Sequence, residues 1–179
     1  METLDPYLDD CERVERGVFA KIHAHPWLVV VANEPDEGDR WRVFRTTNIS
    51  ARRLAQKPDY PSIQAAYRVL KVVKAGDSPW SNRVSIGRAR NNDIVVRHRS
   101  VSKLHAHFFV DDDQGMSLAD AGSRNGTRVN GRRLAANETV LLAANDELRF
   151  GSVDAIYKTP LEFYDFLQNI LAGPRVGPT

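Results

Sequence analysis

Three groups of residues between Ser85 and Gly131 carry side chains that can hold an anion. The first group is Gly87-Arg88, the second is Ser102-Lys103-Leu104-His105, and the third is Ser123-Arg124-Asn125-Gly126-Thr127. They offer a guanidinium, a hydroxyl, an ammonium and a side-chain amide, and each group lies where a short apolar run gives way to turn residues. We therefore predict that three loops meet at one end of a β-sandwich and hold a phosphate group there.

The elements that would position these loops are many short strands between Arg68 and Lys158, a pattern typical of an all-β sandwich. The strongest turn between them is Asn130-Gly131, because both residues accept the positive φ that a tight hairpin requires. The strands are expected near Arg68–Lys74, Arg83–Ile86, Asp93–Val96, Ala106–Val110, Met116–Ala119, Thr127–Val129, Arg132–Leu134, Thr139–Leu141, Glu147–Phe150 and Ala155–Lys158.

The segment before the sandwich is predicted to contain a helix and a β-hairpin. The helix begins at Asp5-Pro6, since aspartate can cap a helix and proline is tolerated at its first position. Three- and four-residue spacing predicts one apolar stripe along it, made of Cys11, Val14, Val18 and Ile22 with Phe19 beside them, which must pack on another element. A strand at 27–32, a turn at 33–38 and a returning strand at 40–46 follow. A short helix at 50–56 and a linker at 57–61 complete this segment.

Another helix is predicted after Pro160, with Gly173-Pro174 after its last turn. Its residues at helical spacing are Leu161, Tyr164, Leu167 and Leu171, with Phe163, Phe166 and Ile170 alongside. The expected organisation is a helix-and-hairpin extension at residues 1–60 packed on the main domain, a sandwich at 66–158, a helix at 159–173 and a tail at 174–179.

The composition favours a soluble globular protein. The chain has 179 residues, of which 42% are hydrophobic and 27% are charged, a balance that excludes general disorder. Its apolar runs are too short for a membrane span, and no secretory signal opens it, so we expect a cytoplasmic location. Cys11 is the only cysteine, which excludes an internal disulfide and a cysteine-based zinc site.

The formal net charge is only +2, but the excess of basic residues gathers mostly in the predicted loops. They are Arg88, Arg90, Arg97, Arg99, Lys103, Arg124, Arg128, Arg132 and Arg133. A basic loop face favours an anionic partner.

The order of four fragments closely resembles the forkhead-associated (FHA) domain family. They are Ile86-Gly87-Arg88, Asn92-Asp93-Ile94, Val101-Ser102-Lys103-Leu104-His105-Ala106, and Asp120-Ala121-Gly122-Ser123-Arg124-Asn125-Gly126-Thr127 followed by Val129-Asn130-Gly131. The resemblance covers about residues 66–158. It implies a mainly β fold, an FHA-type sandwich of about eleven strands, that binds phosphothreonine peptides through loops at one end.

The resemblance also implies roles for individual residues. It places Arg88, Ser102 and Lys103 on the phosphate, which carries nearly two negative charges and three acceptor oxygens. It places Asn125 on the peptide backbone beside the phosphothreonine, a task that suits an amide able to donate and accept. The position of Arg124 is often Ser or Thr in the family. Arg124 is therefore a departure, and it leaves open whether this residue favours an acidic residue downstream or contacts the phosphate itself.

Three further residues are expected to shape the site without touching the ligand. Gly87 allows a sharp turn or a close backbone approach before Arg88. In the family the histidine at position 105 fixes the serine loop through hydrogen bonds, so His105 is expected to be scaffold. Gly126 is expected to shape the third loop. Asn92 and Asp93 are expected to stabilise a turn by bonds from side chain to backbone.

Other kinds of site can be assembled from the same residues. His98, His105 and His107 suggest a metal site, but no carboxylate or cysteine completes a ligand set. Ser102, His105 and Asp120 suggest a hydrolase triad, but no nucleophile elbow accompanies them. We therefore predict no metal, no cofactor and no enzyme activity.

The predicted function is phosphothreonine-dependent protein–protein interaction in signalling, which recruits partners after a Ser/Thr kinase has modified them. Two alternatives remain open: an FHA-like interaction or oligomerisation module that needs no phosphate, and a nucleic-acid-binding protein that uses the arginine-rich loops. Nucleic acid is not the expected partner, because no aromatic residues interleave with these arginines. The sequence leaves the partner, the kinase, the peptide preference and the oligomeric state open.

Overall fold

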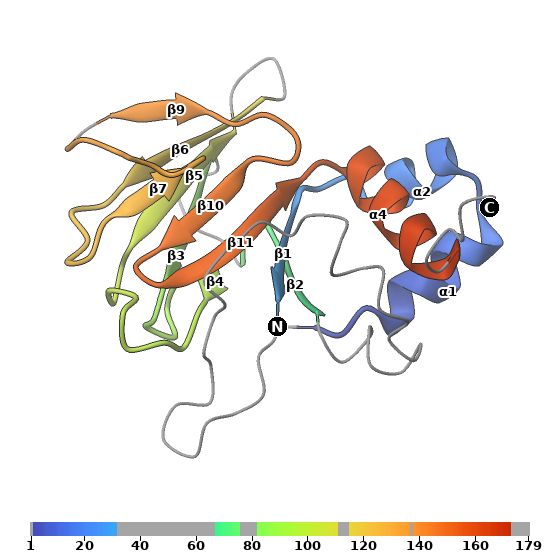
Figure 1. The fold of residues 1–179 in the computed structure, drawn as a ribbon, viewed down its shortest axis with the longest axis horizontal. Coiled ribbons are helices and arrows are strands. Elements are labelled where there is room, and N and C mark those ends of the chain that lie inside the picture. The colour runs from blue at the N-terminus through green and yellow to red at the C-terminus, as the bar shows by residue number, and fades with distance from the viewer. Residues whose placement is uncertain (1, 32–66, 76–81, 111–114, 137, 173–179) are drawn as a thin grey trace, which may run out of the picture.

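The computed structural model describes residues 2–31, 67–75, 82–110, 115–136 and 138–172. In these stretches eleven strands form one six-stranded and one five-stranded sheet (Figure 1). The strands are β1 (Trp27–Val31), β2 (Tyr67–Lys71), β3 (Arg83–Gly87), β4 (Ile94–Val95), β5 (Ala106–Val110), β6 (Met116–Asp120), β7 (Thr127–Val129), β8 (Arg132–Arg133), β9 (Thr139–Leu141), β10 (Glu147–Phe150) and β11 (Val153–Lys158). The predicted mainly β sandwich is confirmed.

The two sheets have the strand orders β2-β1-β11-β10-β7-β8 and β4-β3-β5-β6-β9. All paired strands are antiparallel except β3 and β4, which run parallel. The first strand of the chain is not at an edge, because β1 pairs with β2 on one side and β11 on the other. The six-stranded sheet therefore depends on a strand from the N-terminal segment.

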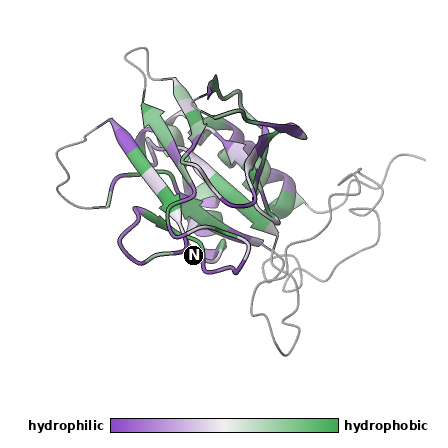
Figure 2. Ribbon diagram, turned by 90° about the vertical axis from the view of Figure 1, so that its left-hand side faces the viewer, coloured by the Kyte–Doolittle hydropathy of each residue, from purple (hydrophilic) through white to green (hydrophobic). Residues whose placement is uncertain are grey.

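Alternation along the strands builds the core between the sheets. In β11 Val153, Ala155 and Tyr157 are buried, and in β5 Ala106 and Phe108 are buried, as expected for strands with one face on the core. Hydrophobic residues accordingly run along the strands with polar residues between them (Figure 2). The sheets face each other across this core, and the loops at the end of the sandwich away from the helices carry the predicted site residues.

Among the described residues, three helices form a second layer beyond β1 and β2 (Figure 1): α1 (Asp5–Arg13), α2 (Arg16–Ile22) and α4 (Pro160–Ala172). Their core includes Trp27 and Val29 of β1, whose neighbour Leu28 faces the sandwich core. The Trp27 ring stacks on Phe163 of α4 with ring centroids 4.5 Å apart. β1 is thus buried on both faces, which explains its unbroken apolar sequence.

The predicted single N-terminal helix is wrong. Val14 and Glu15 have extended backbone and separate α1 from α2, so helical spacing does not continue from one to the other. Val18 is 46% exposed and Ile22 is 57% exposed, and Phe19 is the buried residue of α2. Asp5 is the first residue of α1 and does not cap it.

The predicted apolar stripe of the C-terminal helix is also shifted. The buried residues of α4 are Phe163, Leu167 and Ile170, whereas Leu161 is 38% exposed. The stripe is displaced because α4 packs against α1, α2 and the Trp27 ring of β1. The spacing of apolar residues along the chain does not show where these neighbours lie.

The strands expected at β5, β7, β9 and β10 have the predicted bounds, and the others differ by one to three residues at an end. Asn130 and Gly131 both have positive φ, 49° and 79°, as the hairpin prediction required. The returning strand at 40–46 and the helix at 50–56 lie outside the described residues. Within the described part of the chain, every helix is too short or too polar to traverse a membrane.

Candidate functional site

Three loops meet at one end of the sandwich and are joined by hydrogen bonds through the β4–β5 loop (residues 96–105). The backbone N–H of Arg88, in the β3–β4 loop, donates to the carbonyl oxygen of Ser102 over 2.8 Å. The backbone N–H of Arg124, in the β6–β7 loop, donates to Ser102 Oγ over 3.0 Å. Asn125 Nδ2 in the same loop donates to the carbonyl oxygen of Ser100 over 2.7 Å. The predicted site residues are therefore neighbours in space.

The Arg88 side chain is exposed and is partly fixed by the protein. Its Nε donates to the carbonyl oxygen of Val101 over 3.1 Å, and it pairs with no carboxylate among the described residues. A guanidinium has five N–H donors, so four remain for a ligand. This hydrogen bond orients the plane of the guanidinium group and leaves its positive charge without a carboxylate partner.

Ser102, Lys103 and Asn125 also keep polar groups that can bind. Ser102 Oγ accepts from Arg124, and its own hydroxyl proton is still able to donate. Lys103 is exposed. Asn125 is exposed and uses one of its two amide protons on Ser100, which leaves the other proton and Oδ1.

Gly87 is required by a close approach between two loops. A β-carbon at this position would lie 2.3 Å from the carbonyl oxygen of Lys103 and 2.9 Å from Asn92 Nδ2. That carbonyl oxygen accepts from Asn92 Nδ2 over 2.7 Å and from the N–H of Ala89 over 3.1 Å. Asn92 Nδ2 also donates to the carbonyl oxygen of Ala89, as expected of a turn-stabilising side chain. The β3–β4 and β4–β5 loops are therefore fixed to each other just behind Arg88.

Asp93 does not stabilise that turn as expected. Its carboxylate accepts from both the N–H and the hydroxyl of Ser85, from the N–H of Ala75 and from Lys74 Nζ. Burial would raise the pKa of Asp93, but these hydrogen bonds outweigh it and lower the pKa below its usual value. Asp93 therefore anchors β3 and the segment after β2.

His105 is fully buried and joins two of the loops. Its Nδ1 accepts from the N–H of Ser102 over 3.0 Å, so the proton of the neutral ring lies on Nε2. Nε2 then donates to the carbonyl oxygen of Gly126 over 3.2 Å. Burial lowers the pKa of His105 despite the opposing effects of Gly126 and Asp120, which keeps the ring neutral in the folded protein.

Asp120 organises the β6–β7 loop, a role that the sequence analysis missed. Its carboxylate accepts from the hydroxyls of Ser123 and Thr127, each over 2.6 Å, and from the N–H groups of Gly122 and Ser123. Burial would raise the pKa of Asp120, but these hydrogen bonds lower it. An aspartate side chain often accepts from N–H groups two or three residues later in a turn. The sequence Asp-Ala-Gly-Ser at 120–123 could therefore have identified this role.

Gly126 follows Asn125 and has a φ of 80°, which side-chain-bearing residues rarely adopt. A β-carbon there would also lie 2.5 Å from Nε of Arg133. The guanidinium of Arg133, on β8, thus lies directly over the third loop. From the sequence, Arg133 was assigned only to a general basic surface.

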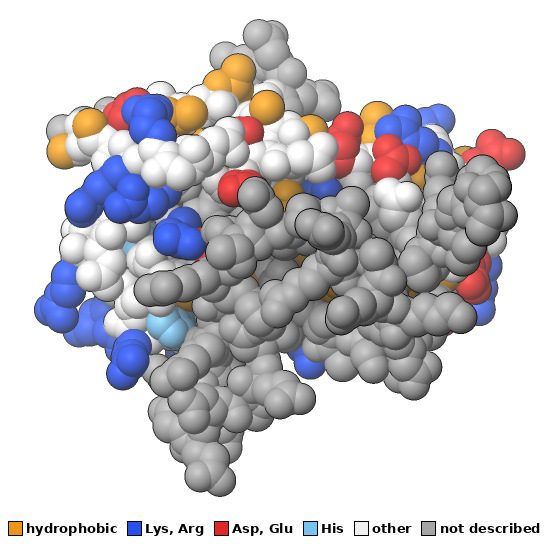
Figure 3. Space-filling view, viewed as in Figure 1, with side chains coloured by type: hydrophobic (Ala, Val, Ile, Leu, Met, Phe, Trp, Pro, Cys, Tyr) orange, Lys and Arg blue, Asp and Glu red, His pale blue; other side chains and the backbone are white. Residues whose placement is uncertain are grey.

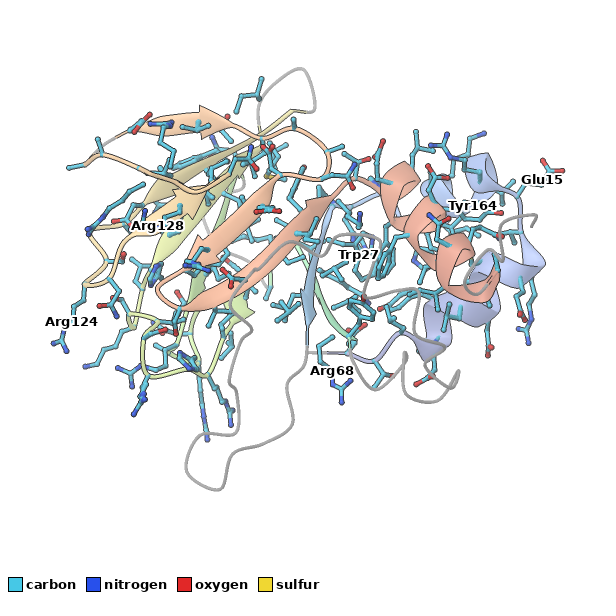
Figure 4. The ribbon with its side chains drawn as sticks, viewed as in Figure 1. Glu15, Trp27, Arg68, Arg124, Arg128 and Tyr164 are labelled. Atoms are coloured by element: carbon cyan, nitrogen blue, oxygen red, sulfur yellow. The ribbon has the colours of Figure 1, made fainter. Side chains whose placement is uncertain are left out.

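Lys and Arg side chains gather at this end of the molecule, over the β7–β8 region and the neighbouring loops (Figure 3). Arg124 and Arg128 both lie at this end, away from the helices (Figure 4). This surface suits an anionic ligand.

The histidines do not assemble a metal site. No group of three His, Cys, Asp or Glu residues in the described ranges is placed to hold a metal ion. Both ring nitrogens of His105 bind backbone groups, and Nδ1 of His98 lies 2.6 Å from Ser100 Oγ.

Comparison with protein families matches residues 84–151 to the FHA domain. The chain contains an FHA domain. The match runs from β3 to the end of β10 and includes all three loops of the site, so the predicted family is confirmed. β1, β2 and β11 lie outside the matched residues but belong to the same six-stranded sheet as β10 and β7.

Known proteins match about two fifths to one half of this chain. An ABC transporter ATP-binding/permease protein of Mycobacterium tuberculosis is 39% identical over 41% of this chain and 8% of its own length. The glycogen accumulation regulator GarA of M. tuberculosis is 31% identical over 50% of this chain and 57% of its own length. A solved structure of M. tuberculosis EmbR in complex with a low-affinity phosphopeptide is 28% identical, covering 44% of this chain and 20% of that chain with a TM-score of 0.40. The chain thus spans little more than half of GarA and a small part of the transporter.

Proposed function

We propose that the FHA domain binds a phosphothreonine-containing segment of another protein and recruits that partner, in the cytoplasm, after a Ser/Thr kinase has acted. The domain catalyses no reaction on its ligand. Arg88, Ser102 and Lys103 bind the phosphate, Asn125 binds the adjoining peptide backbone, and Arg124 borders both. Recognition of phosphorylated motifs by FHA domains supports this assignment.

The observation that carries the proposal is the position of Ser102 at the junction of the loops. Its carbonyl oxygen accepts from the N–H of Arg88 and its Oγ accepts from the N–H of Arg124. A group that reaches the Ser102 hydroxyl therefore lies close to the backbone of both arginines. A phosphate there would meet permanent positive charge with no competing carboxylate among the described residues.

The energy of such contacts is sufficient for a specific but reversible complex. Each hydrogen bond to a charged group contributes about 1.5–3 kcal/mol net. Several of them, reduced by the entropy lost when the peptide is ordered, correspond to an affinity on the order of micromolar. Such an affinity suits recruitment that ends when a phosphatase removes the group.

The test is titration of matched threonine and phosphothreonine peptides, selected from an oriented phosphopeptide library, against the parent and Arg88→Ala. We expect only the phosphorylated peptide to bind, and Arg88→Ala to weaken it by about 2 kcal/mol or more, which is about thirtyfold in Kd. Arg13→Ala, which removes an exposed arginine from α1, is the control and should bind like the parent.

Two results would contradict the proposal. Equal binding of both peptides would make this a phosphate-independent FHA module. Parental affinity in Arg88→Ala would remove that residue from the site.

A further inference from the structure

A row of arginines crosses the outer face of the six-stranded sheet, beginning at the proposed site. Arg133 of β8 lies directly opposite Arg128 of β7, and Arg128 lies opposite Arg149 of β10. Arg149 in turn lies opposite Asp154 of β11. Directly opposite residues share one face of a sheet, so the four side chains form a continuous line.

Only the far end of this row is neutralised. Arg149 Nη2 donates to Asp154 Oδ2 over 3.0 Å. Arg128 Nη1 donates to the carbonyl oxygen of Gly131 over 3.1 Å, and neither Arg128 nor Arg133 contacts a carboxylate among the residues that the structure describes. Both side chains are exposed.

The pairing of Arg128 with Arg133 is unfavourable in the protein by itself. Like charges directly opposite each other on paired strands destabilise a sheet. The same hairpin shows that a carboxylate partner is attainable, because the neighbouring Arg132 pairs with Glu138 over 2.7 Å. The positive charge at positions 128 and 133 is therefore left for a partner outside the described fold.

The row is continuous with the proposed phosphate site through Arg133. Its guanidinium lies against Gly126, which is buried although it lies in a loop. Gly126 immediately follows Asn125, the residue assigned to the peptide backbone. A peptide held by Asn125 thus has Arg133 and then Arg128 beside its path.

We propose that Arg133 and Arg128 bind a second anionic group on the same ligand and select phosphopeptides with an acidic neighbouring segment. This inference rests on the proposed function and adds a specificity determinant to it. A carboxylate and a second phosphate share the required chemistry, because both present oxygens that match the planar guanidinium fork. The partner is an acidic protein segment, since Arg133 adjoins the residue that holds the peptide.

The experiment uses the full chain and four peptides. Two contain phosphothreonine, one with neutral flanks and one with aspartates in the flanks, and two are their unphosphorylated counterparts. Arg128→Gln/Arg133→Gln is compared with the parent and with Arg13→Gln/Lys21→Gln, which removes two exposed charges from the helices. Melting temperatures verify that all variants fold.

For the parent we expect the acidic phosphopeptide to bind about tenfold more tightly than the neutral one. In Arg128→Gln/Arg133→Gln this ratio should fall to about one, with affinity for the neutral phosphopeptide unchanged within about twofold. The control should keep the parental ratio. Phosphopeptides with the aspartates placed before or after the phosphothreonine identify the side on which the second group lies.

Three results would overturn the inference. The first is a parental ratio in the double variant, and the second is an equal loss of affinity for neutral and acidic phosphopeptides. The third is random duplex DNA that displaces the acidic peptide and loses its binding in the double variant, which would make the row a nucleic-acid surface. Failure of the proposed function is recognised separately, because the parent would then bind the neutral phosphorylated and unphosphorylated peptides equally.

Discussion

Replacing His105 with alanine tests whether the site depends on a buried, uncharged scaffold. The imidazole accepts from the N–H of Ser102 and donates to the carbonyl oxygen of Gly126. Its edge also packs on Phe150, with ring centroids 5.8 Å apart. The substitution removes both hydrogen bonds and leaves a cavity, because the residue is 0% exposed.

The magnitude follows from these contacts. Leaving a buried donor or acceptor without a partner costs about 1–3 kcal/mol. The substitution leaves two such groups, the N–H of Ser102 and the carbonyl oxygen of Gly126. With the cavity and lost packing, we expect a decrease of about 4 kcal/mol in the free energy of unfolding, a large part of the stability of a typical domain. For a chain of this length the melting temperature should fall by about 8–16 °C.

Lys103→Ala is the matched control, since it also alters a residue of the β4–β5 loop but removes an exposed side chain. Its stability should change by less than about 0.5 kcal/mol. Thermal and urea unfolding followed by circular dichroism measure both variants. His105→Gln, which can replace one of the two hydrogen bonds, provides an intermediate if His105→Ala does not fold. Equal melting shifts in His105→Ala and Lys103→Ala would refute the scaffold role.

Two other predictions concern the glycine before Arg88 and the three histidines whose pKa burial lowers. In Gly87→Ala the new β-carbon would meet the Lys103 carbonyl oxygen at 2.3 Å. We expect a loss of about 2 kcal/mol in unfolding free energy, from the two hydrogen bonds to that carbonyl, together with weaker phosphopeptide binding. The control is Gly17→Ala in α2, where a new β-carbon would have no atom within 4 Å, and it should raise the unfolding free energy by about 1 kcal/mol. Unchanged stability in Gly87→Ala would contradict the close approach at Gly87. Burial lowers the pKa of His25, His105 and His107 below 6.5, so protons bind the unfolded chain first as the pH falls. The stability that these neutral histidines contribute is present above pH 6.5 and is lost at lower pH. The urea concentration at the unfolding midpoint should therefore be lower at about pH 5.5 than at about pH 7.5. A higher midpoint at about pH 5.5 would contradict these pKa directions.

The strands and the loop positions could be predicted because their signals are local. Asn130-Gly131 has the two positive φ angles that a tight hairpin requires, and both strands beside it were found. Arg88, Ser102 and Asn125 each lie in a loop between two strands, in a fixed family order, so their meeting at one end followed from the sandwich. The close approach behind Gly87 was anticipated from the residue type alone.

The C-terminal helix was predicted within one residue at each end, but the buried faces of the helices could not be predicted because distant strands determine them. Val18 and Phe19 are adjacent on α2, and only contact with α4 and β1 decides that Phe19 is buried. The position of β1 between β2 and β11 is likewise a pairing between opposite ends of the chain, without a sequence pattern to reveal it. Arg133 was missed as a neighbour of the site for the same reason, since its contact with Gly126 depends on the register of β7 and β8.

The residues that hold the loops together differ from those that carry the positive charge, and this difference explains how a loop site can be both rigid and charged. Neutral groups hold the loops together: backbone N–H and carbonyl groups, the His105 ring, and the side chains of Asn92 and Ser123. The charged group that joins them is the carboxylate of Asp120, which accepts from Ser123. The cationic side chains of Arg88, Lys103 and Arg124 therefore need not stabilise the fold. Because the loops are ordered before the ligand arrives, little conformational entropy remains to be lost on binding. Loss of a cation should thus weaken binding with little effect on stability, whereas loss of a neutral scaffold residue should reduce both.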